Sequence, residues 1–470
     1  MIFIPKGGLI LSEDINLSFP SANNFFMKDI IPKRNVPFIL EDLNEEKSIL
    51  TSYSDGDTLN GTLRDSLRKS LLGIQYPAGD KSILYGFFAK LKTGASDGSQ
   101  TRIMHYGDSQ IEGDRITGLI RNELQKRFKG NGPGLFPLIP VAPKAWSNNS
   151  YSSNWKRYTG FGKKDSLVNH NNYGALLNFS RFTEIKEDSI NKDTATHEAW
   201  IEIVPSNKSY PKASVFNEVT MYYDHCTAPV FLHVFKDNKL FKEEALSISR
   251  NISQYKIAFE SPASSIKFIF KTKISPNILG FSISSGSGVI IDNIPLRGGS
   301  GTEFSSINRK HIAEMLEMLQ PDLFIMQFGG NVLPYLESDK KCQDYCDWLE
   351  SNLRMVKKMI PGSALILIGP ADMSVKMENE FITHPYLEKL RDGLKKAAFN
   401  SGSAYWDMYQ AMGGKNAMPL WVNANPPLAS KDYIHFTSEG ARKIAELFFE
   451  SFYEDYKLWE QNHKNEKKNL

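Results

Sequence analysis

The feature that most constrains the fold is a repeated alternation between short apolar segments and helical segments in the second half of the chain. Three apolar segments are candidate strands: "PDLFIMQFGGN" at 321–331, "SALILIGPAD" at 363–372 and "SAYWDMY" at 403–409. Helical patterns follow them in "YCDWLESNLRMVKKMI", "PYLEKLRDGLKKAAFNSG" and "TSEGARKIAELFFESFY". Strands that are apolar throughout are typical of a parallel sheet with helices on both faces. The sequence therefore predicts an α/β domain.

The same alternation starts earlier and is then interrupted. An amphipathic helix is predicted over 80–93, a strand over 102–107, a helix over 111–128, and the next strand only over 288–296. In between, six short β-branched and aromatic runs follow one another without a helical period: "HEAWIEIVP", "NEVTMYYDH", "PVFLHVFKD", "YKIAFES", "SSIKFIFKT" and "ILGFSISSG". Such spacing is typical of an antiparallel sandwich or jelly roll. A β domain is therefore expected as an insertion between the first and second strands of the α/β domain.

This organisation gives five predicted regions. They are an irregular N-terminal extension at 1–75, the first part of the α/β domain at 76–150, the inserted β domain at 151–285, the second part of the α/β domain at 286–456, and a charged tail at 457–470.

Charge and cysteine content exclude several classes of function. The chain has 56 Lys and Arg against 53 Asp and Glu, a net charge of +3, which gives no reason to propose a nucleic acid or an anionic membrane as partner. Its three cysteines are too few for a disulfide framework. No His-x-x-x-His or Cys-x-x-Cys pair occurs, so neither a metal nor another cofactor is predicted. No apolar run reaches the length of a membrane-spanning helix, and the first residues lack the basic and apolar parts of a signal peptide.

Four segments carry candidate functional residues at or beside the carboxyl ends of predicted strands, where doubly wound sheets form their sites. Ser109, in "GDSQ", follows the first strand, and Gly298, in "PLRGGSG", follows the second. Asn331, in "FGGN", follows the third, and Asp432 and His435, in "KDYIHFTSEG", precede the last helix. Taken alone, each has an ordinary structural explanation as a cap, a bend or a turn. Their order and placement together favour a catalytic set.

The chemistry of this set is that of acyl transfer. A serine hydroxyl needs a base to take its proton, and His435 can be that base, oriented by the Asp432 carboxylate on its other ring nitrogen. The backbone N–H groups of Ser109 and Gly298, with the Asn331 amide, would suit the oxyanion that forms when Ser109 attacks a carbonyl. A helix beginning at Ser109 would place its dipole at the same point.

These blocks resemble those of the SGNH (GDSL-type) hydrolases, which implies a flavodoxin-like three-layer α/β/α fold. Gln110 stands where leucine is frequent in that group, and Val332 stands where many members have an acidic residue. Residues 80–455 further resemble the peptidoglycan O-acetylesterase-like subgroup, in which a jelly-roll, carbohydrate-binding-like module interrupts the catalytic domain. The resemblance implies that Asp108, Gln110, Gly330 and Trp406 are pocket neighbours.

The resemblance implies a serine esterase that removes O-acetyl groups from a carbohydrate polymer, with peptidoglycan as a candidate, and that uses no cofactor. Two alternatives stay open: an O-acetyltransferase with the same Ser, His and Asp, and a carbohydrate-binding or scaffold protein with an unused hydrolase fold. The substrate class implies a periplasmic or extracellular location, while the absence of a recognisable signal peptide leaves a cytoplasmic one open.

Overall fold

The computed structural model describes residues 9–12, 15–17, 72–143, 145–185 and 195–466. Contacts divide the chain into two units, Met1–Asp57 and Thr58–Leu470. The described part of the first unit is a two-stranded antiparallel hairpin of β1 (Leu9–Ser12) and β2 (Ile15–Leu17). Most of the predicted N-terminal extension and the last residues of the predicted tail lie outside the described residues.

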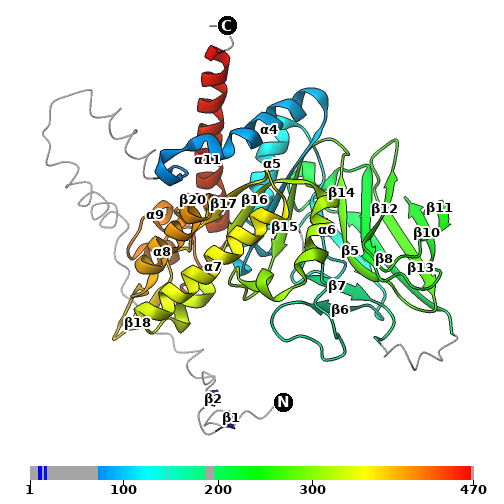
Figure 1. Cartoon of the computed structure of the whole chain (residues 1–470), viewed down its shortest axis with the longest axis horizontal. Helices are drawn as coiled ribbons and strands as arrows, with labels where there is room; N and C mark the ends of the chain where they lie inside the picture. Colours follow the sequence, from blue (N-terminus) through cyan, green and yellow to red (C-terminus); the bar gives the residue numbers. More distant parts are fainter. Residues whose placement is uncertain (1–8, 13–14, 18–71, 144, 186–194, 467–470) are drawn as a thin grey trace, which may run out of the picture. The chain divides into compact units, whose positions relative to one another are not determined.

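The second unit contains a five-stranded parallel sheet in the order β15-β3-β16-β17-β20 (Figure 1). Its strands are β3 (Gln100–Gly107), β15 (Gly288–Pro295), β16 (Pro321–Gln327), β17 (Ala364–Ile368) and β20 (Ala404–Trp406). Every neighbouring pair is parallel. Numbered along the chain, this order is 2-1-3-4-5, the flavodoxin-like order of doubly wound sheets. The predicted α/β fold is confirmed.

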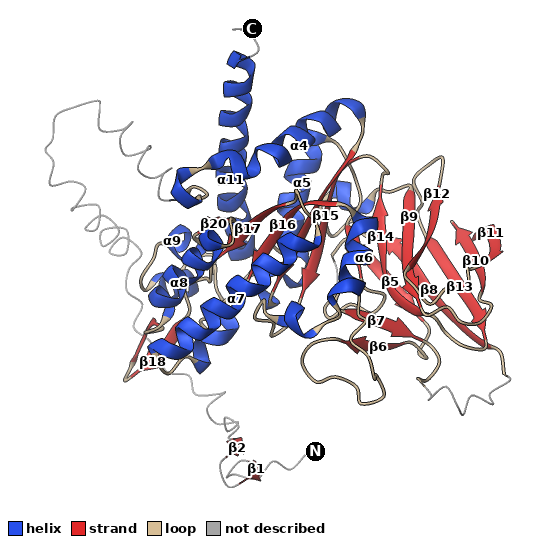
Figure 2. Cartoon of the chain, viewed as in Figure 1, coloured by secondary structure: helices blue, strands red, loops and turns tan. Residues whose placement is uncertain are grey.

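Helices cover both faces of this sheet (Figures 1 and 2). They are α4 (Tyr85–Asp97), α5 (Thr117–Phe128), α6 (Arg309–Leu319), α7 (Asp339–Met359), α8 (Leu387–Asn400), α9 (Met408–Met412), α10 (Ala417–Asn423) and α11 (Ser438–Glu466). Successive residues of one strand belong to different cores: Ile103 and Ile325 pack with α4, α5 and α11, while Met104 and Met326 pack with α6, α7 and α8. Burial on both faces explains why these strands are apolar throughout.

The β-rich block forms two antiparallel sheets, β11-β10-β13-β8-β5 and β12-β9-β14-β7-β6, with β4 added on β14. The strands are β4 (Gly134–Phe136), β5 (Ser147–Tyr151), β6 (Lys156–Thr159), β7 (Asn178–Arg181), β8 (His197–Pro205), β9 (Glu218–Asp224), β10 (Phe231–Lys236), β11 (Lys239–Ala245), β12 (Ser253–Ala258), β13 (Ile266–Thr272) and β14 (Asn277–Ser284). One core lies between the sheets, where the rings of Phe268 and Phe281 are 5.4 Å apart. The block interrupts the α/β domain between β3 and β15, as predicted.

Two strands that pair inside this block precede the predicted boundary at residue 151. Leu135 in β4 faces Ser282 in β14, and Asn148 in β5 faces Val204 in β8. The division at 151 and the description of the block as a jelly roll remain predictions.

The predicted helix over 111–128 is wrong in its first turn. Ser109–Asp114 form a 3₁₀ segment, η3, and α5 begins only at Thr117. Gly113 and Asp114 have φ of 66° and 68°, a left-handed conformation that an α-helix cannot continue through. Ser109 therefore does not lie at the N-terminus of α5, and the expected helix-dipole contribution at Ser109 is not available.

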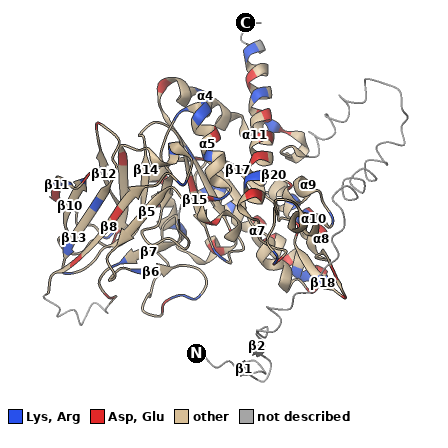
Figure 3. Cartoon of the chain, turned by 180° about the vertical axis from the view of Figure 1, so that it is seen from behind, with Lys and Arg blue, Asp and Glu red and all other residues tan. Residues whose placement is uncertain are grey.

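The remaining described elements are short. A hairpin of β18 (Ser374–Met377) and β19 (Glu380–Thr383) follows β17, and 3₁₀ turns occur at Pro77–Gly79, Lys81–Leu84, Pro211–Ser214, Glu303–Ser306 and Gly330–Tyr335. None of the helices within the described ranges is both long and apolar enough to cross a bilayer. The positions of Lys and Arg and those of Asp and Glu are interspersed along the ribbon (Figure 3).

Candidate active site

A cleft of about 420 Å³, part of it open to solvent, lies at the carboxyl ends of β3, β16 and β17. The segments that follow these strands line it, together with the start of α9 and the loop before α11: residues 108–110, 327–328, 330–331, 369–373, 408 and 434–435. Three of the four predicted segments thus meet at one cleft. This is the place where sheets of this topology form their sites.

The end of β3 places Ser109 at the mouth of this cleft. At Gly107 a Cβ would come within 3.0 Å of the Ile111 side chain and 3.2 Å of the Gln327 carbonyl, so a larger residue would crowd the turn. Asp108 then caps η3, since its Oδ1 accepts from the Gln110 N–H at 2.9 Å. The turn directs the Ser109 side chain toward the loop before α11.

Ser109, His435 and Asp432 form a continuous chain of hydrogen bonds. The Oγ of Ser109 lies 2.9 Å from Nε2 of His435, and Nδ1 of His435 lies 2.8 Å from Oδ2 of Asp432. Each ring nitrogen therefore has its own partner. With the Nδ1 proton donated to the carboxylate, Nε2 is free to accept the Ser109 proton.

The Asp432 carboxylate is oriented by its own loop. Its Oδ1 accepts from the backbone N–H groups of Ile434 and His435, both at 3.0 Å, which leaves Oδ2 for the imidazole. Burial acts to raise the pKa of Asp432, but the hydrogen bonds from His435 and Ile434 outweigh it, so the pKa lies below its ordinary value. Asp432 is therefore ionised at neutral pH and can stabilise a protonated His435.

Two further predicted residues lie on adjoining loops. Asn331 lines the cleft, and its Nδ2 donates to the Gly299 carbonyl at 2.9 Å. An amide nitrogen carries two donors, so the second remains for an oxyanion. Gly298 has φ of 74° at the third position of a turn closed by the Gly299 N–H and the Leu296 carbonyl at 2.7 Å, a position that favours glycine. It does not line the cleft.

A clamp that the sequence did not indicate joins the serine turn to the histidine loop. Gln110 donates from Nε2 to the Ile434 carbonyl at 2.7 Å and accepts from the Phe436 N–H at 3.3 Å, so it holds the backbone on both sides of His435. Arg115 donates to the carbonyl groups of Ser109 and Phe436. Gln110 was predicted only as a pocket neighbour. Its clamping contacts, and the contact of Arg115 with Phe436, join loops 320 or more positions apart.

The other predicted neighbours divide into two kinds. Asp108 and Gly330 line the cleft with Gln110. Burial raises the pKa of Asp108 to about 6, against the opposing bond from the Gln110 N–H. Trp406 is a correction: its ring is fully buried in the core beneath α11, where Nε1 donates to the Leu72 carbonyl at 3.0 Å and the ring meets Phe448. Met408, two residues later, lines the cleft instead.

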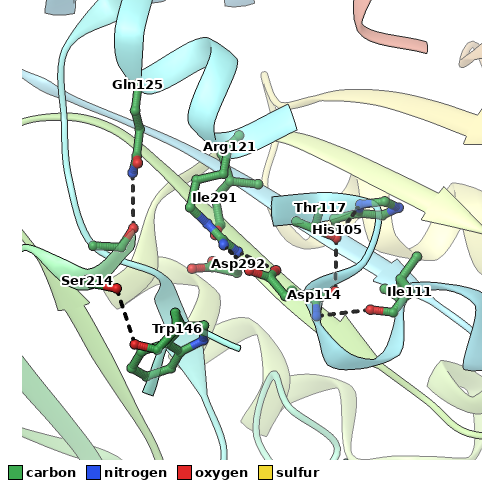
Figure 4. Close-up of polar contacts among 12 residues, drawn as sticks. His105, Ile111, Asp114, Thr117, Arg121, Gln125, Trp146, Ser214, Ile291 and Asp292 are labelled. Atoms are coloured by element: carbon green, nitrogen blue, oxygen red, sulfur yellow. Dashed lines mark hydrogen bonds and ion pairs between the residues drawn. The ribbon is translucent and has the colours of Figure 1, made fainter. Parts of the chain in front are cut away.

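A buried polar network supports the serine turn from below. His105 Nδ1 lies 3.0 Å from Thr117 Oγ1 (Figure 4). The other ring nitrogen lies 3.2 Å from Gln327 Oε1, and Thr117 donates to Asn293, which donates to the Ile111 carbonyl. Burial lowers the pKa of His105 to about 3, so this imidazole is neutral. The network fixes η3 on β3 and β15, and Gln327 is the member that also lines the cleft.

Within the described ranges, no group of three or more His, Cys, Asp or Glu side chains is arranged to hold a metal ion. Cys226, Cys342 and Cys346 are free and buried.

Comparison with known proteins places this geometry on a known fold. No protein-family model matches the chain, and no curated protein matches its sequence. A solved peptidoglycan O-acetylesterase superposes with a TM-score of 0.62 at 18% identity, over 79% of this chain and 96% of that chain. A GDSL-like lipase from Parabacteroides merdae and a catalytic mutant of an acetylxylan esterase from Geobacillus stearothermophilus each match 35% of this chain and 72% of their own, with TM-scores of 0.27 and 17% identity. The chain therefore shares the fold of the peptidoglycan O-acetylesterase.

Proposed function

We propose that the protein is a serine esterase that removes O-acetyl groups from a carbohydrate polymer. The observation that carries the proposal is the chain of hydrogen bonds from Ser109 through His435 to Asp432 at the edge of the sheet where a substrate can enter. This is the arrangement that activates a serine hydroxyl, and it recurs on unrelated folds.

Acylation begins when Ser109 Oγ attacks the acetyl carbonyl. His435 takes the hydroxyl proton at Nε2, and the Asp432 carboxylate stabilises the imidazolium that results. The carbonyl oxygen becomes an oxyanion, for which the second donor of the Asn331 amide and the Ser109 N–H are the candidate partners, with Gly298 N–H as a third. As the tetrahedral intermediate collapses, His435 returns the proton to the sugar oxygen that leaves.

Deacylation reverses the roles with water as the nucleophile. His435 removes a proton from the water that attacks the acetyl group on Ser109, and Asn331 again faces the oxyanion. Acetate leaves, and Ser109 regains its proton from His435. The clamp by Gln110 and Arg115 keeps the two loops in register through both steps, since each step needs the same distance between Oγ and Nε2.

The carbohydrate part of the proposal is supported by the similarity of fold. A peptidoglycan O-acetylesterase overlaps with this chain over nearly its whole length, and the overlap is too long to be confined to the α/β domain. We therefore propose an acetylated polysaccharide, with peptidoglycan as the leading candidate, as the substrate. A periplasmic or extracellular location follows from that substrate.

Two measurements test the proposal. Hydrolysis of 4-nitrophenyl acetate by the wild type and by Ser109→Ala tests the nucleophile, and equal rates would overturn it. Acetate release from O-acetylated peptidoglycan, compared with acetylated xylan, tests the polymer. If acetate is released from xylan alone, acetylated xylan replaces peptidoglycan as the proposed substrate.

The two alternatives predict different products from the same residues. An O-acetyltransferase would give acetylated sugar in excess of free acetate when an acetyl donor and an oligosaccharide are supplied together. A binding protein with an unused hydrolase fold would hydrolyse no ester while retaining a glycan.

A further inference from the structure

A second cavity, of about 400 Å³, lies between the β-rich block and the α/β domain. Gly113 of η3 and Asn293 and Pro295 of β15 contribute one side, and Arg157 of β6 and Asn178 of β7 contribute the other. Most of the remaining lining is apolar and comes from residues 137, 140–142, 176 and 294. Arg157 is the one charged residue among the described residues that line it.

Arg157 has no partner in the part of the chain that the structure describes. Its Nε is buried without a hydrogen bond, and no carboxylate pairs with its guanidinium. Burial lowers the pKa of Arg157 to about 10, with no opposing contribution from an acidic group. The carboxylate of Glu112, on the neighbouring turn, is already held by two bonds from Arg297, at 2.6 and 2.7 Å. A partly buried cation without an anion is costly unless a ligand supplies one.

A second unsatisfied donor lies beside it. Arg157 and Ser180 are directly opposite in the antiparallel ladder of β6 and β7, so their side chains share a face. The Ser180 hydroxyl is also buried without a partner. Asn178, two residues before Ser180 on the same face, lines the cavity with Arg157. Three polar side chains thus gather on one face, and two of them lack an acceptor.

The cavity adjoins the turn that carries the proposed nucleophile. Gly113 lies four positions after Ser109 in η3, and Pro295 lies opposite Gly107 in the parallel ladder of β15 and β3. Asn293 Nδ2 donates to the Ile111 carbonyl at 3.1 Å, which fixes this turn against the cavity wall. The two ends of this one turn thus line the two sites, Ser109 and Gln110 the cleft and Gly113 the cavity.

We propose that Arg157, with Asn178 beside it in the cavity lining, forms a subsite for a carboxylate carried by a substituent of the acetylated saccharide. A guanidinium fork matches a carboxylate in shape and charge, and a single arginine neutralises a monoanion. The apolar walls suit a short aliphatic link between the sugar ring and the carboxylate. This inference rests on the proposed function, because it assigns the substrate group that the esterase would select.

Binding tests the subsite without any turnover. In the full chain carrying Ser109→Ala, calorimetry measures the affinity for N-acetylmuramic acid, for its methyl ester, and for methyl glucuronoside, whose carboxylate is attached directly to the ring. We expect N-acetylmuramic acid to bind and its methyl ester to bind roughly 10–100-fold more weakly, as for the loss of a charge-assisted hydrogen bond. Equal affinity of acid and ester, or no binding of the acid, would overturn the subsite. Tighter binding of the glucuronoside would reassign the carboxylate to the ring.

Variants assign the effect to Arg157. Adding Arg157→Met should remove the preference for the acid over the ester, and Arg157→Lys should restore part of it. Lys156→Met is the matched control, since Lys156 is the adjacent cation on β6, is exposed and pairs with Asp165. An equal loss with Lys156→Met would overturn the assignment, as would a general loss of thermal stability with Arg157→Met. The rate on 4-nitrophenyl acetate should stay at the wild-type value in the control Lys156→Met. Loss of that rate in Ser109→Ala tests the proposed function separately.

Discussion

Gln110 Nε2 donates to the carbonyl oxygen of Ile434 at 2.7 Å, so the side chain next to Ser109 holds the residue next to His435. The two residues are 324 positions apart in the chain. The distance between Ser109 Oγ and His435 Nε2 thus depends on a contact between their neighbours. A leucine at this position could not make that contact, because its side chain has no hydrogen-bond donor.

Gln110→Met should therefore slow the reaction through misplacement of His435. The substitution keeps the volume and removes both hydrogen bonds to the histidine loop, and small misplacements at a catalytic group can cost about 10²-fold in rate. We expect kcat on 4-nitrophenyl acetate to fall by about 10–100-fold, with KM little changed. Gln343→Met, on the exposed face of α7, is the control and should have the rate of the wild type. A wild-type kcat in Gln110→Met would show that the clamp has no role.

Ser109→Ala should lose the esterase activity while keeping the fold. The hydroxyl bonds to His435 alone among the described residues, and removal of a triad nucleophile costs about 10⁶-fold in turnover. Steady-state hydrolysis of an activated acetate ester measures the loss, and thermal unfolding checks the fold. Activity within about tenfold of the wild type would contradict the mechanism, because the residual rate without the nucleophile comes only from binding and the oxyanion donors.

The strands and the order of the catalytic set could be predicted from the sequence because both follow from local pattern. Ile103 and Met104 are both apolar because each faces a different core. The apolar run therefore predicts a strand without any knowledge of the adjacent strands. Ser109 and His435 were identifiable because each follows or precedes an element at the same edge of the sheet.

Other features could not be predicted because tertiary contacts decide them. Gly113 and Asp114 end a helical pattern through left-handed backbone that side-chain periodicity does not report. Trp406 directly follows an apolar pair, and the local sequence pattern does not indicate whether its ring faces the cleft or the core. Arg115 donates to the Phe436 carbonyl, 321 positions away. Arg157 is buried without a partner for its Nε among the described residues, and only the folded chain shows this.

Asn331→Ala should lower kcat by roughly 10²–10³-fold, the cost of one oxyanion donor. Asn331 also bonds to the Gly299 carbonyl at 2.9 Å, so some loss could come from a displaced loop. Asn331→Asp loses the bond to Gly299 as Asn331→Ala does, and its carboxylate would in addition repel the oxyanion. We expect Asn331→Asp to be at least as slow as Asn331→Ala. A rate in Asn331→Asp close to that of the wild type would exclude the oxyanion role.

The stability of the fold should depend on pH through Asp108. Burial raises the pKa of this carboxyl to about 6 in the folded chain, above the ordinary 3.8. Between these values the folded state binds the proton more tightly than the unfolded state, so the stabilising contribution is complete below about pH 4 and is lost as pH rises through about 6. This difference in pKa between the folded and the unfolded chain corresponds to a few kcal/mol of unfolding free energy.

Asp108→Asn tests this sign. Its side-chain oxygen can still cap the Gln110 N–H, and it does not titrate. Denaturant unfolding at pH 4, 5, 6 and 7 should show the variant gaining free energy of unfolding relative to the wild type as pH rises, with a plateau above about pH 6. A difference that is constant across this range, or that runs the other way, would contradict the raised pKa.

The stability of the packing between the β-rich block and the α/β domain should depend on a buried ion pair. Arg102 Nη1 donates to both oxygens of Asp292 at 2.9 Å, Arg102 Nη2 donates to Ser282 Oγ on β14, and the Leu135 N–H on β4 donates to Asp292 at 2.7 Å. Asp292 is fully buried. Asp292→Ala would leave the Arg102 charge buried without an acidic partner. We expect the free energy of unfolding to fall by about 4 kcal/mol, as is typical when one partner of a buried ion pair is removed.

The double variant separates the cost of the unpaired charge from the value of the pair itself. Arg102→Met combined with Asp292→Leu removes both charges and fills the space, and such replacements are often neutral or stabilising. We expect the double variant to be more stable than Asp292→Ala in denaturant unfolding. Asp344→Asn, which breaks the exposed pair with Lys340 on α7, is the control and should cost at most about 0.5 kcal/mol. A double variant as unstable as Asp292→Ala would mean that the bonds to Leu135 and Ser282, which join the block to the sheet, matter more than the burial of charge.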